Sequence, residues 1–318
     1  MLFRSTDAEF LELWETHKSP SKVAKALGTN LRNVYRRRDN LSKKYNVTLK
    51  TNKEIKTWSP PASKSELGIE NGTVIVFSDA HFWPGIRTTA FQGLLWAIEK
   101  LQPKAVICNG DAFDGASISR HPPLGWARTP SVIEELNTCK EMLSEVSEAI
   151  KKARHNAKLI YTMGNHDARF EMRLASNAPQ YVQTPGFKLS DHFPEWHFCM
   201  LTWVTKEIIV KHRYKGGIHA AHNNTVGAGK SIVTGHLHSL KVTPYADYNG
   251  NRFGVDTGTL AEPYGPQFDY SEGNPLNHRS GFAVLTIKDG KLLWPELVHK
   301  WEDGKIEFRG EVIDVSDL

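Results

Sequence analysis

The chain has few cysteines, and no segment of it is apolar over a long stretch. The three cysteines, Cys108, Cys139 and Cys199, are odd in number and form no CxxC pattern, which excludes a disulfide-stapled scaffold and a thiolate metal site. No stretch approaches the ~20 apolar residues that a membrane-spanning helix needs. The first four residues lead into acidic residues rather than an apolar run. We therefore expect no secretory signal, no membrane partner and a cytoplasmic location.

The overall composition is that of a globular protein, with 40% hydrophobic and 24% charged residues. A length of 318 residues is enough for a catalytic domain and an appendage. Charge is uneven, because residues 1–58 hold 13 Lys and Arg against 6 Asp and Glu, whereas the rest of the chain holds 27 against 29. A basic appendage on a near-neutral body favours a polyanionic partner, although basic helices are also common as solvated faces.

The N-terminal segment has the pattern of three short helices. An apolar stripe that includes Phe10 and Trp14 predicts a first helix over residues 7–16. Ser19-Pro20 begins a second helix that ends at Gly28, and a third follows it. Two short helices joined by a glycine turn, the second rich in Arg and Asn, indicate a helix-turn-helix. Its outward face would present residues suited to phosphates and base edges, namely Asn30, Arg32, Asn33, Arg36 and Arg37.

A small helical bundle for protein docking is the alternative interpretation of these helices. Residues 58–61 read Trp-Ser-Pro-Pro, a stiff and turn-prone stretch that predicts a boundary. We divide the chain into a helix-turn-helix domain over residues 1–56, a linker over 57–71 and a catalytic domain over 72–318. Residues 176–205, with three prolines and several aromatics, are interpreted as an insertion that caps the cleft or mediates self-association.

Beyond residue 72, polar side chains recur where predicted strands meet loops. The motifs are Asp79-Ala80-His81, Gly110-Asp111-Ala112-Phe113-Asp114, Gly164-Asn165-His166-Asp167, a strand ending at His212, and Gly235-His236-Leu237-His238. Carboxylate, amide and imidazole groups are ligands for hard and borderline divalent cations. The carboxyl ends of strands in βαβ units gather ligands at one edge, so we expect the motifs to meet. The side-chain period of two predicts that Asp79 and His81 lie on one side of an extended chain, and the same holds for His236 and His238.

The order and residue types of these motifs resemble the calcineurin-like metallophosphoesterase superfamily, from about Gly72 to the C-terminus. The resemblance implies an α/β fold, namely a four-layer α/β/β/α metallophosphoesterase sandwich with a small N-terminal helical (helix-turn-helix) domain. It also implies two divalent metal ions, with Mn preferred over Fe, Zn, Co or Ni. One ion would be held by Asp79, His81, Asp111 and His238, and the other by Asp111, Asn165, His212 and His236.

The same resemblance gives roles to residues beside the metal ligands. His166 would face the substrate as the catalytic histidine, and Asp167 would hold its imidazole in the right tautomer. Asp114 would orient a histidine or the turn.

His212 is the least typical of these positions, because the family usually has glycine where this chain has Arg213. His219 and His222, on a predicted helix, are rivals for its place. We favour His212 because the other ligands also sit at strand ends. Arg213 would itself contact a substrate phosphate.

The expected activity is hydrolysis of a phosphate ester by a hydroxide activated at the two metal ions. The first hypothesis is a DNA phosphodiesterase (nuclease) targeted by the N-terminal helix-turn-helix, as in the phage-encoded members that the chain resembles; DNA is then the partner and the host cytoplasm the location. Its strand-binding groove would be lined by Arg120, His121, Arg128, Arg169 and Arg173. The second hypothesis is a phosphomonoesterase acting on nucleotides or phosphoproteins. The third is a DNA-binding regulator with a structural metal site.

Overall fold

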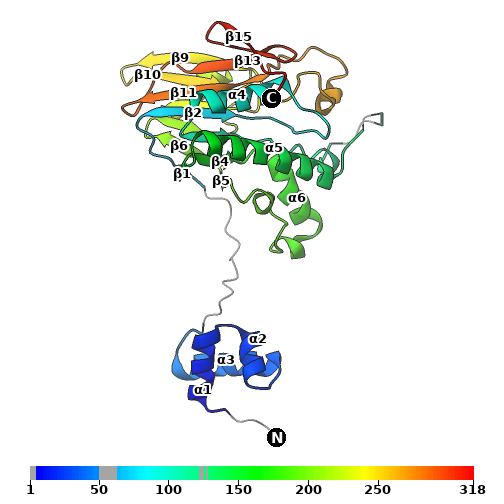
Figure 1. Cartoon of the computed structure of the whole chain (residues 1–318), viewed down its shortest axis with the longest axis vertical. Coiled ribbons are helices and arrows are strands. Elements are labelled where there is room, and N and C mark those ends of the chain that lie inside the picture. Colours follow the sequence, from blue (N-terminus) through cyan, green and yellow to red (C-terminus); the bar gives the residue numbers. More distant parts are fainter. Residues whose placement is uncertain (1–4, 50–62, 122–124, 127) are drawn as a thin grey trace. The chain divides into compact units, whose positions relative to one another are not determined.

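The structure, a computed structural model, describes residues 5–49, 63–121, 125–126 and 128–318. The chain divides into two compact units, Met1–Pro60 and Pro61–Leu318, and each is described by itself (Figure 1). The boundary expected at residues 58–61 lies outside the described residues.

The N-terminal unit, within residues 5–49, contains α1 (Asp7–His17), α2 (Pro20–Ala26) and α3 (Leu31–Tyr45). Thr6 starts α1 through a capping box with Glu9, and the side chain of Asn30 caps α3. Gly28 has a φ of 59° in the turn between α2 and α3, a left-handed conformation that glycine adopts without a steric cost. One face of each helix contributes to a small apolar core made of Phe10, Trp14, Val23, Ala24, Val34 and Leu41.

The larger sheet of the second unit has parallel strands on one side of β2 and antiparallel strands on the other. Its order is β15 (Glu311–Asp314), β14 (Lys305–Phe308), β13 (Glu296–Glu302), β11 (Gly281–Lys288), β2 (Gly72–Phe77), β3 (Ala105–Cys108), β4 (Lys158–Thr162) and β5 (His197–Cys199), with β12 (Lys291–Leu292) paired to β11. The connections are α4 (Thr89–Leu101) between β2 and β3, α5 (Val132–Ala153) between β3 and β4, and α6 (Asp167–Asn177) after β4. The parallel half is therefore built from βαβ units, as expected.

The smaller sheet has the order β1 (Ser65–Glu66), β6 (Thr202–Thr205), β7 (Ile208–Val210), β8 (Ser231–Thr234), β10 (Gly250–Asp256) and β9 (Lys241–Asp247). Its strands β7, β8 and β10 are parallel to one another, and α7 (Ala220–Ala228) packs on β8, β9 and β10. Short 3₁₀ helices occur at Ala116–Ile118, Pro179–Tyr181, Leu189–His192 and Pro266–Ser271. None of the helices among the described residues combines the length and apolar character of a membrane span.

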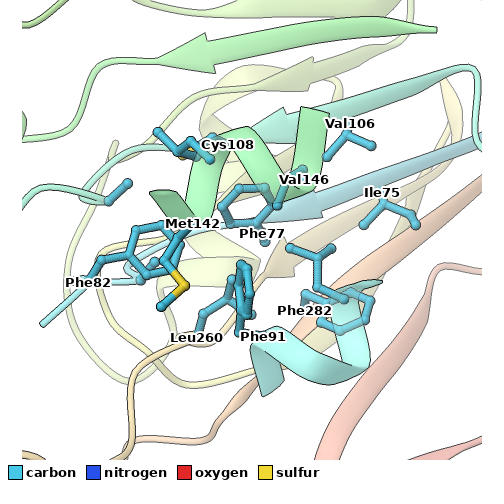
Figure 2. Packing of buried hydrophobic residues seen from close by; sticks show 14 of the residues in the cluster. Ile75, Phe77, Phe82, Phe91, Val106, Cys108, Met142, Val146, Leu260 and Phe282 are labelled. Atoms are coloured by element: carbon cyan, nitrogen blue, oxygen red, sulfur yellow. The ribbon is translucent and has the colours of Figure 1, made fainter. Parts of the chain in front are cut away.

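The layers of the second unit follow from the strand period of two, which sends alternate side chains of β2 to opposite faces. Val74 and Val76 pack in the core that the two sheets share. Ile75 and Phe77 face the helical side, where Figure 2 shows Phe77 close to Val146 of α5. The layer order is helix, sheet, sheet, helix, and the mixed α/β class expected from the sequence is confirmed.

Two expectations about the connecting segments are wrong. Residues 65–69, assigned to the linker, belong to the second unit, because β1 pairs with β6 and Leu67 and Ile69 are buried between the sheets. Residues 176–205 are not a single insertion, since β5 extends the larger sheet beside β4 and β6 joins the smaller one. These strands have two to four residues each, too few to show a clear period.

Candidate metal centre

The metal-ligand candidates meet where strands of both sheets end. Asp79 and Asp111 follow β2 and β3, and their loops remain joined, since the Asp79 N–H donates to the Gly110 carbonyl (2.9 Å) and the His81 N–H to the Asp111 carbonyl (3.0 Å). Asn165, His212 and His236 follow β4, β7 and β8. Because parallel strands of the two packed sheets end on one side, residues distant in the chain converge there.

The backbone at these positions is left-handed rather than extended. The φ values are 52° at Asp79, 40° at His81, 55° at Asp111, 72° at His236 and 56° at His238. The argument from strand alternation is therefore wrong for both pairs. Asp79 and His81 come together, and so do His236 and His238, because the chain turns sharply after the strand ends.

One group of ligands consists of Asp79, His81 and His238, whose ligand atoms lie within 4.8 Å of one another. Asp79 Oδ1 is 3.1 Å from His238 Nε2, while Asp79 Oδ2 accepts a hydrogen bond from the His236 N–H at 2.8 Å. All three side chains are buried. One ligand atom from each of these side chains could therefore contact the same ion.

The second group consists of Asp111, His212 and His236. His212 Nε2 lies 3.0 Å from Asp111 Oδ2 and 3.2 Å from Asn165 Oδ1, so the amide of Asn165 joins this group. Asp111 is also within reach of His81 and His166. A carboxylate placed between the two groups is suited to contact ions in both.

His212, and neither rival histidine, lies in this centre. Its Nδ1 donates to the Asn109 carbonyl at 2.8 Å, which turns Nε2 toward Asp111. His222 instead packs its ring against Tyr245, and His219 precedes the first turn of α7.

The charged groups of the centre favour the binding of cations. Burial raises the pKa of Asp79, but the nearby charges of His238 and His212 outweigh it and lower that pKa to about 2. Burial lowers the pKa of His212, but the charges of Asp111 and Asp79 outweigh it and raise the pKa to about 10. The His212 proton thus occupies the space between ligand atoms that a divalent cation would fill, and metal binding would release it. The donor set fits two divalent cations of the borderline type, and Asp79, His81, Asp111, Asn165, His212, His236 and His238 are the residues that would hold them.

Asp114 links the side chains of His81 and His166. Its Oδ1 accepts from His81 Nδ1 at 2.7 Å and from His166 Nδ1 at 2.9 Å. Burial raises the pKa of Asp114, but these two histidines outweigh it and hold the pKa well below its usual range. Both imidazoles therefore carry their proton on Nδ1 and present Nε2 to the site.

The orienting role expected of Asp167 is wrong, because Asp114 occupies that position. Asp167 is fully buried and accepts hydrogen bonds from the backbone N–H groups of Asp111 (2.8 Å) and Gly164 (2.9 Å) and from the Tyr161 hydroxyl (2.7 Å). Burial and the charge of Asp111 raise its pKa to about 6. Asp167 thus fastens the loops after β3 and β4 to each other and does not touch the His166 ring.

A cleft of about 590 Å³ opens beside this centre. We call it the arginine cleft, since Arg120, Arg169, Arg173 and Arg213 line it together with His121, Asn165, His166 and His236. Arg213, expected to contact a phosphate, is exposed in its wall. Arg128, the remaining member of the predicted groove, is not among the described residues that line it.

Some residues of the site carry no signal in the sequence. His278 lies with its Nδ1 3.3 Å from His238 Nδ1, and no motif surrounds it. Burial and the charge of His238 lower the pKa of His278 to about 4, so it stays neutral. Asn109 could have been found, because it directly precedes the Gly110-Asp111 motif and supports His212.

The residues expected on the outward face of α3 behave differently from one another. Arg32, Asn33 and Arg36 are exposed. Arg37 is not free for a partner, because its guanidinium donates to the Ser5 carbonyl and hydroxyl and stacks on the Phe10 ring, which ties α3 to the start of α1. The Asn30 side chain serves as the helix cap.

Buried carboxylates and imidazoles in two adjoining groups, at the shared edge of two sheets, define a candidate site for divalent metal ions. Residues 72–252 match the family described as Calcineurin-like phosphoesterase, and the chain belongs to that family, which implies a metal-dependent phosphoester hydrolase. Members of this family typically bind two divalent metals. No curated protein matches the chain.

Two solved structures are similar at low identity. Vps29 from Chaetomium thermophilum is 10% identical with a TM-score of 0.40, and the match covers 76% of this chain and 96% of Vps29. A protein serine/threonine phosphatase from Saccharomyces cerevisiae, with similarity to human phosphatase PP5, is 10% identical with a TM-score of 0.37, over 94% of this chain and 91% of that one. These scores are too low to bear on activity.

Proposed function

We propose that the protein is a DNA phosphodiesterase whose N-terminal unit binds the same polyanion. The observation that carries the proposal is the arginine cleft, which places four guanidinium groups beside the metal-ligand groups. A phosphomonoester has a single phosphate to bind, whereas a strand offers flanking phosphates along its length. Arg169 and Arg173 are one helical turn apart on α6, about 6 Å along its axis, so they are suited to successive groups on an extended ligand.

Different residues of the site would carry out different parts of the hydrolysis. When bound, two divalent cations, Mn²⁺ before Fe, Zn, Co or Ni, supply a Lewis acid and an activated water. His166 presents Nε2 to the leaving oxygen of the ester, held by the Asp114 carboxylate at Nδ1. Arg213 and the other arginines of the cleft neutralise phosphate oxygens and fix the direction of the strand.

The N-terminal unit supports DNA as the partner by charge and exposure. Arg32, Asn33 and Arg36 share the exposed side of a basic helix, and Tyr35 adds an exposed ring beside them. Such side chains bind phosphates and stack on or hydrogen-bond to bases. The Tyr35 side chain is accessible to such a partner, because the residue is 43% exposed.

The test compares a diester, a monoester and DNA in the presence of Mn²⁺. We expect turnover of bis-p-nitrophenyl phosphate to exceed that of p-nitrophenyl phosphate, and nicking of supercoiled plasmid that is lost in His166→Ala. A chain lacking residues 1–60 should retain the diester activity and lose plasmid nicking at physiological salt. Turnover of the monoester alone would instead favour a phosphomonoesterase. DNA binding that is unchanged in Asp111→Ala, with no hydrolysis of any ester, would favour a regulator with a structural metal site.

A further inference from the structure

Arg169 lies beside the histidine that faces the substrate. α6 begins immediately after His166, so Arg169 is one turn further on the same side of the helix, and its N–H donates to the His166 carbonyl at 2.9 Å. Its side chain is partly exposed and lines the arginine cleft. The position therefore combines a fixed backbone with access to a ligand.

The Arg169 guanidinium contacts the ring nitrogen of His166 that Asp114 does not contact. Arg169 Nη1 donates to the Asp114 carbonyl at 2.9 Å, and Nη2 lies 3.1 Å from His166 Nε2. Because a guanidinium only donates, Nε2 is the acceptor of this bond. Both ring nitrogens of His166 are then engaged, Nδ1 by the carboxylate and Nε2 by Arg169.

This arrangement occupies the ring nitrogen that would face a substrate. A phosphoryl group entering the cleft brings anionic oxygens, and a guanidinium binds these more strongly than it binds a neutral imidazole, since both partners are then charged. The fork of N–H donors also matches phosphate oxygens in a way that a single ring nitrogen does not. We therefore expect the phosphoryl group to displace His166 Nε2 as the hydrogen-bond partner of Arg169 Nη2.

We propose that Arg169 is a catalytic residue that binds a non-bridging oxygen of the scissile phosphoryl group. On binding, its Nη2 hydrogen bond passes from His166 Nε2 to that oxygen, and the freed Nε2 lone pair takes up a proton from water. The protonated Nε2 then donates this proton to the leaving oxygen as the ester P–O bond breaks, which returns His166 to its neutral form. The inference rests on the proposed phosphoester hydrolysis. Arg154, at the end of α5, serves as the matched control, because it is also partly exposed and donates to a backbone carbonyl, that of Gln102, but does not line the arginine cleft.

The kinetic test uses bis-p-nitrophenyl phosphate, which has one phosphate. Arg169→Ala should lower kcat/KM about 100-fold, the size of effect seen when one donor to a developing oxyanion is removed, while Arg154→Ala should change it less than about twofold. Arg169→Lys keeps the charge without the fork of N–H donors and should recover about tenfold of the loss. Added guanidinium chloride should raise the rate of Arg169→Ala and leave the rates of Arg154→Ala and His166→Ala unchanged.

A binding test keeps this inference separable from the proposed function. The affinity of the Mn²⁺-loaded protein for inorganic phosphate, measured by calorimetry, should fall about tenfold or more in Arg169→Ala and stay within twofold in Arg154→Ala. The measurement needs no turnover, so a protein that hydrolyses no ester still reports on Arg169. Unchanged phosphate affinity in Arg169→Ala and in Arg169→Gln would overturn the proposal, as would equal kinetic losses in Arg169→Ala and Arg154→Ala.

Discussion

Gly164 is the position at which the smallest change should do the most damage to the metal centre. A Cβ added there would lie 2.0 Å from Asp111 Oδ1 and 2.6 Å from the Asp111 nitrogen. Non-bonded carbon and oxygen atoms need more than 3 Å, so the carboxylate would have to retreat by about 1 Å. Ligand distances tolerate about 0.2 Å. Because φ at Gly164 is not positive, the Ala variant has no backbone strain and tests the steric clash alone.

Gly164→Ala should therefore lose the carboxylate that lies between the two ligand groups. We expect Mn²⁺ binding to fall at both sites and kcat/KM for a diester to fall about 100-fold or more, which is the cost of misplacing a catalytic group by about 1 Å. Overpacking should also lower the free energy of unfolding by about 1–3 kcal/mol. Calorimetric titration with Mn²⁺ gives the number of ions, and circular dichroism confirms that the variant is folded.

Two further glycines make the test specific. At Gly235 an added Cβ would meet Asp79 Oδ2 at 2.5 Å, and Asp79 belongs to only one group, so Gly235→Ala should lose one ion and keep the other. Gly216, with nothing within 4 Å of an added Cβ, is the control whose Ala variant should bind two ions. A folded Gly164→Ala that binds two Mn²⁺ ions with wild-type affinity would refute the reasoning.

Three other substitutions have expected outcomes. Asp114→Asn should lower both Mn²⁺ affinity and kcat about 10–100-fold, as losses of ligand-orienting partners do, because one carboxylate holds His81 and His166; an effect on kcat alone would contradict this. Asp167→Asn should lower the free energy of unfolding by about 1–3 kcal/mol, with KM of the folded fraction unchanged. A loss of kcat without a loss of stability would instead support a catalytic role for Asp167. Burial and the charge of Asp114 raise the pKa of Glu135 from 4.5 to about 7, so its stabilising contribution is complete below pH 4.5 and is lost as pH rises through 7. In EDTA, the free energy of unfolding of the wild type should fall by about 3 kcal/mol more than that of Glu135→Gln between pH 4.5 and 8. The same pH dependence of the free energy of unfolding in both proteins would contradict this.

The sequence was most informative where polar motifs end apolar strands. As expected, β2, β3, β4 and β8 each end one or two residues before a polar motif. These strands are recognisable because a strand buried on both faces reads as a continuous apolar run. Residue types that bind metal at the ends of these strands were therefore enough to predict which side chains converge. Even His212, which departs from the usual pattern at Arg213, lies at the centre.

The sequence was least informative where a partner is chosen by geometry alone. Asp114 and Asp167 are both acidic residues near His166, and the resemblance assigned the orienting role to Asp167, whereas Asp114 makes the hydrogen bond to the His166 ring. Asp167 begins α6, and its carboxylate bonds to the loops that follow β3 and β4. Asp114, in contrast, belongs to the motif that follows β3. Edge strands such as β1 were missed for a different reason, since a two-residue strand shows no period.

The left-handed turns at the candidate ligands account for the failure of the alternation argument and also affect the stability of the empty centre. Asp79, His81, Asp111, His236 and His238 hold positive φ without being glycine, and each such residue costs about 1–2 kcal/mol. Two buried carboxylates also lie within the same centre, where histidine protons offset their charge in the absence of an ion. A strained, charged centre of this kind would reduce the stability of the fold when it is empty, and cations that bind only the folded state would raise that stability. The same turns that weaken the empty fold direct the ligand atoms inward, which extended strand ends would not do.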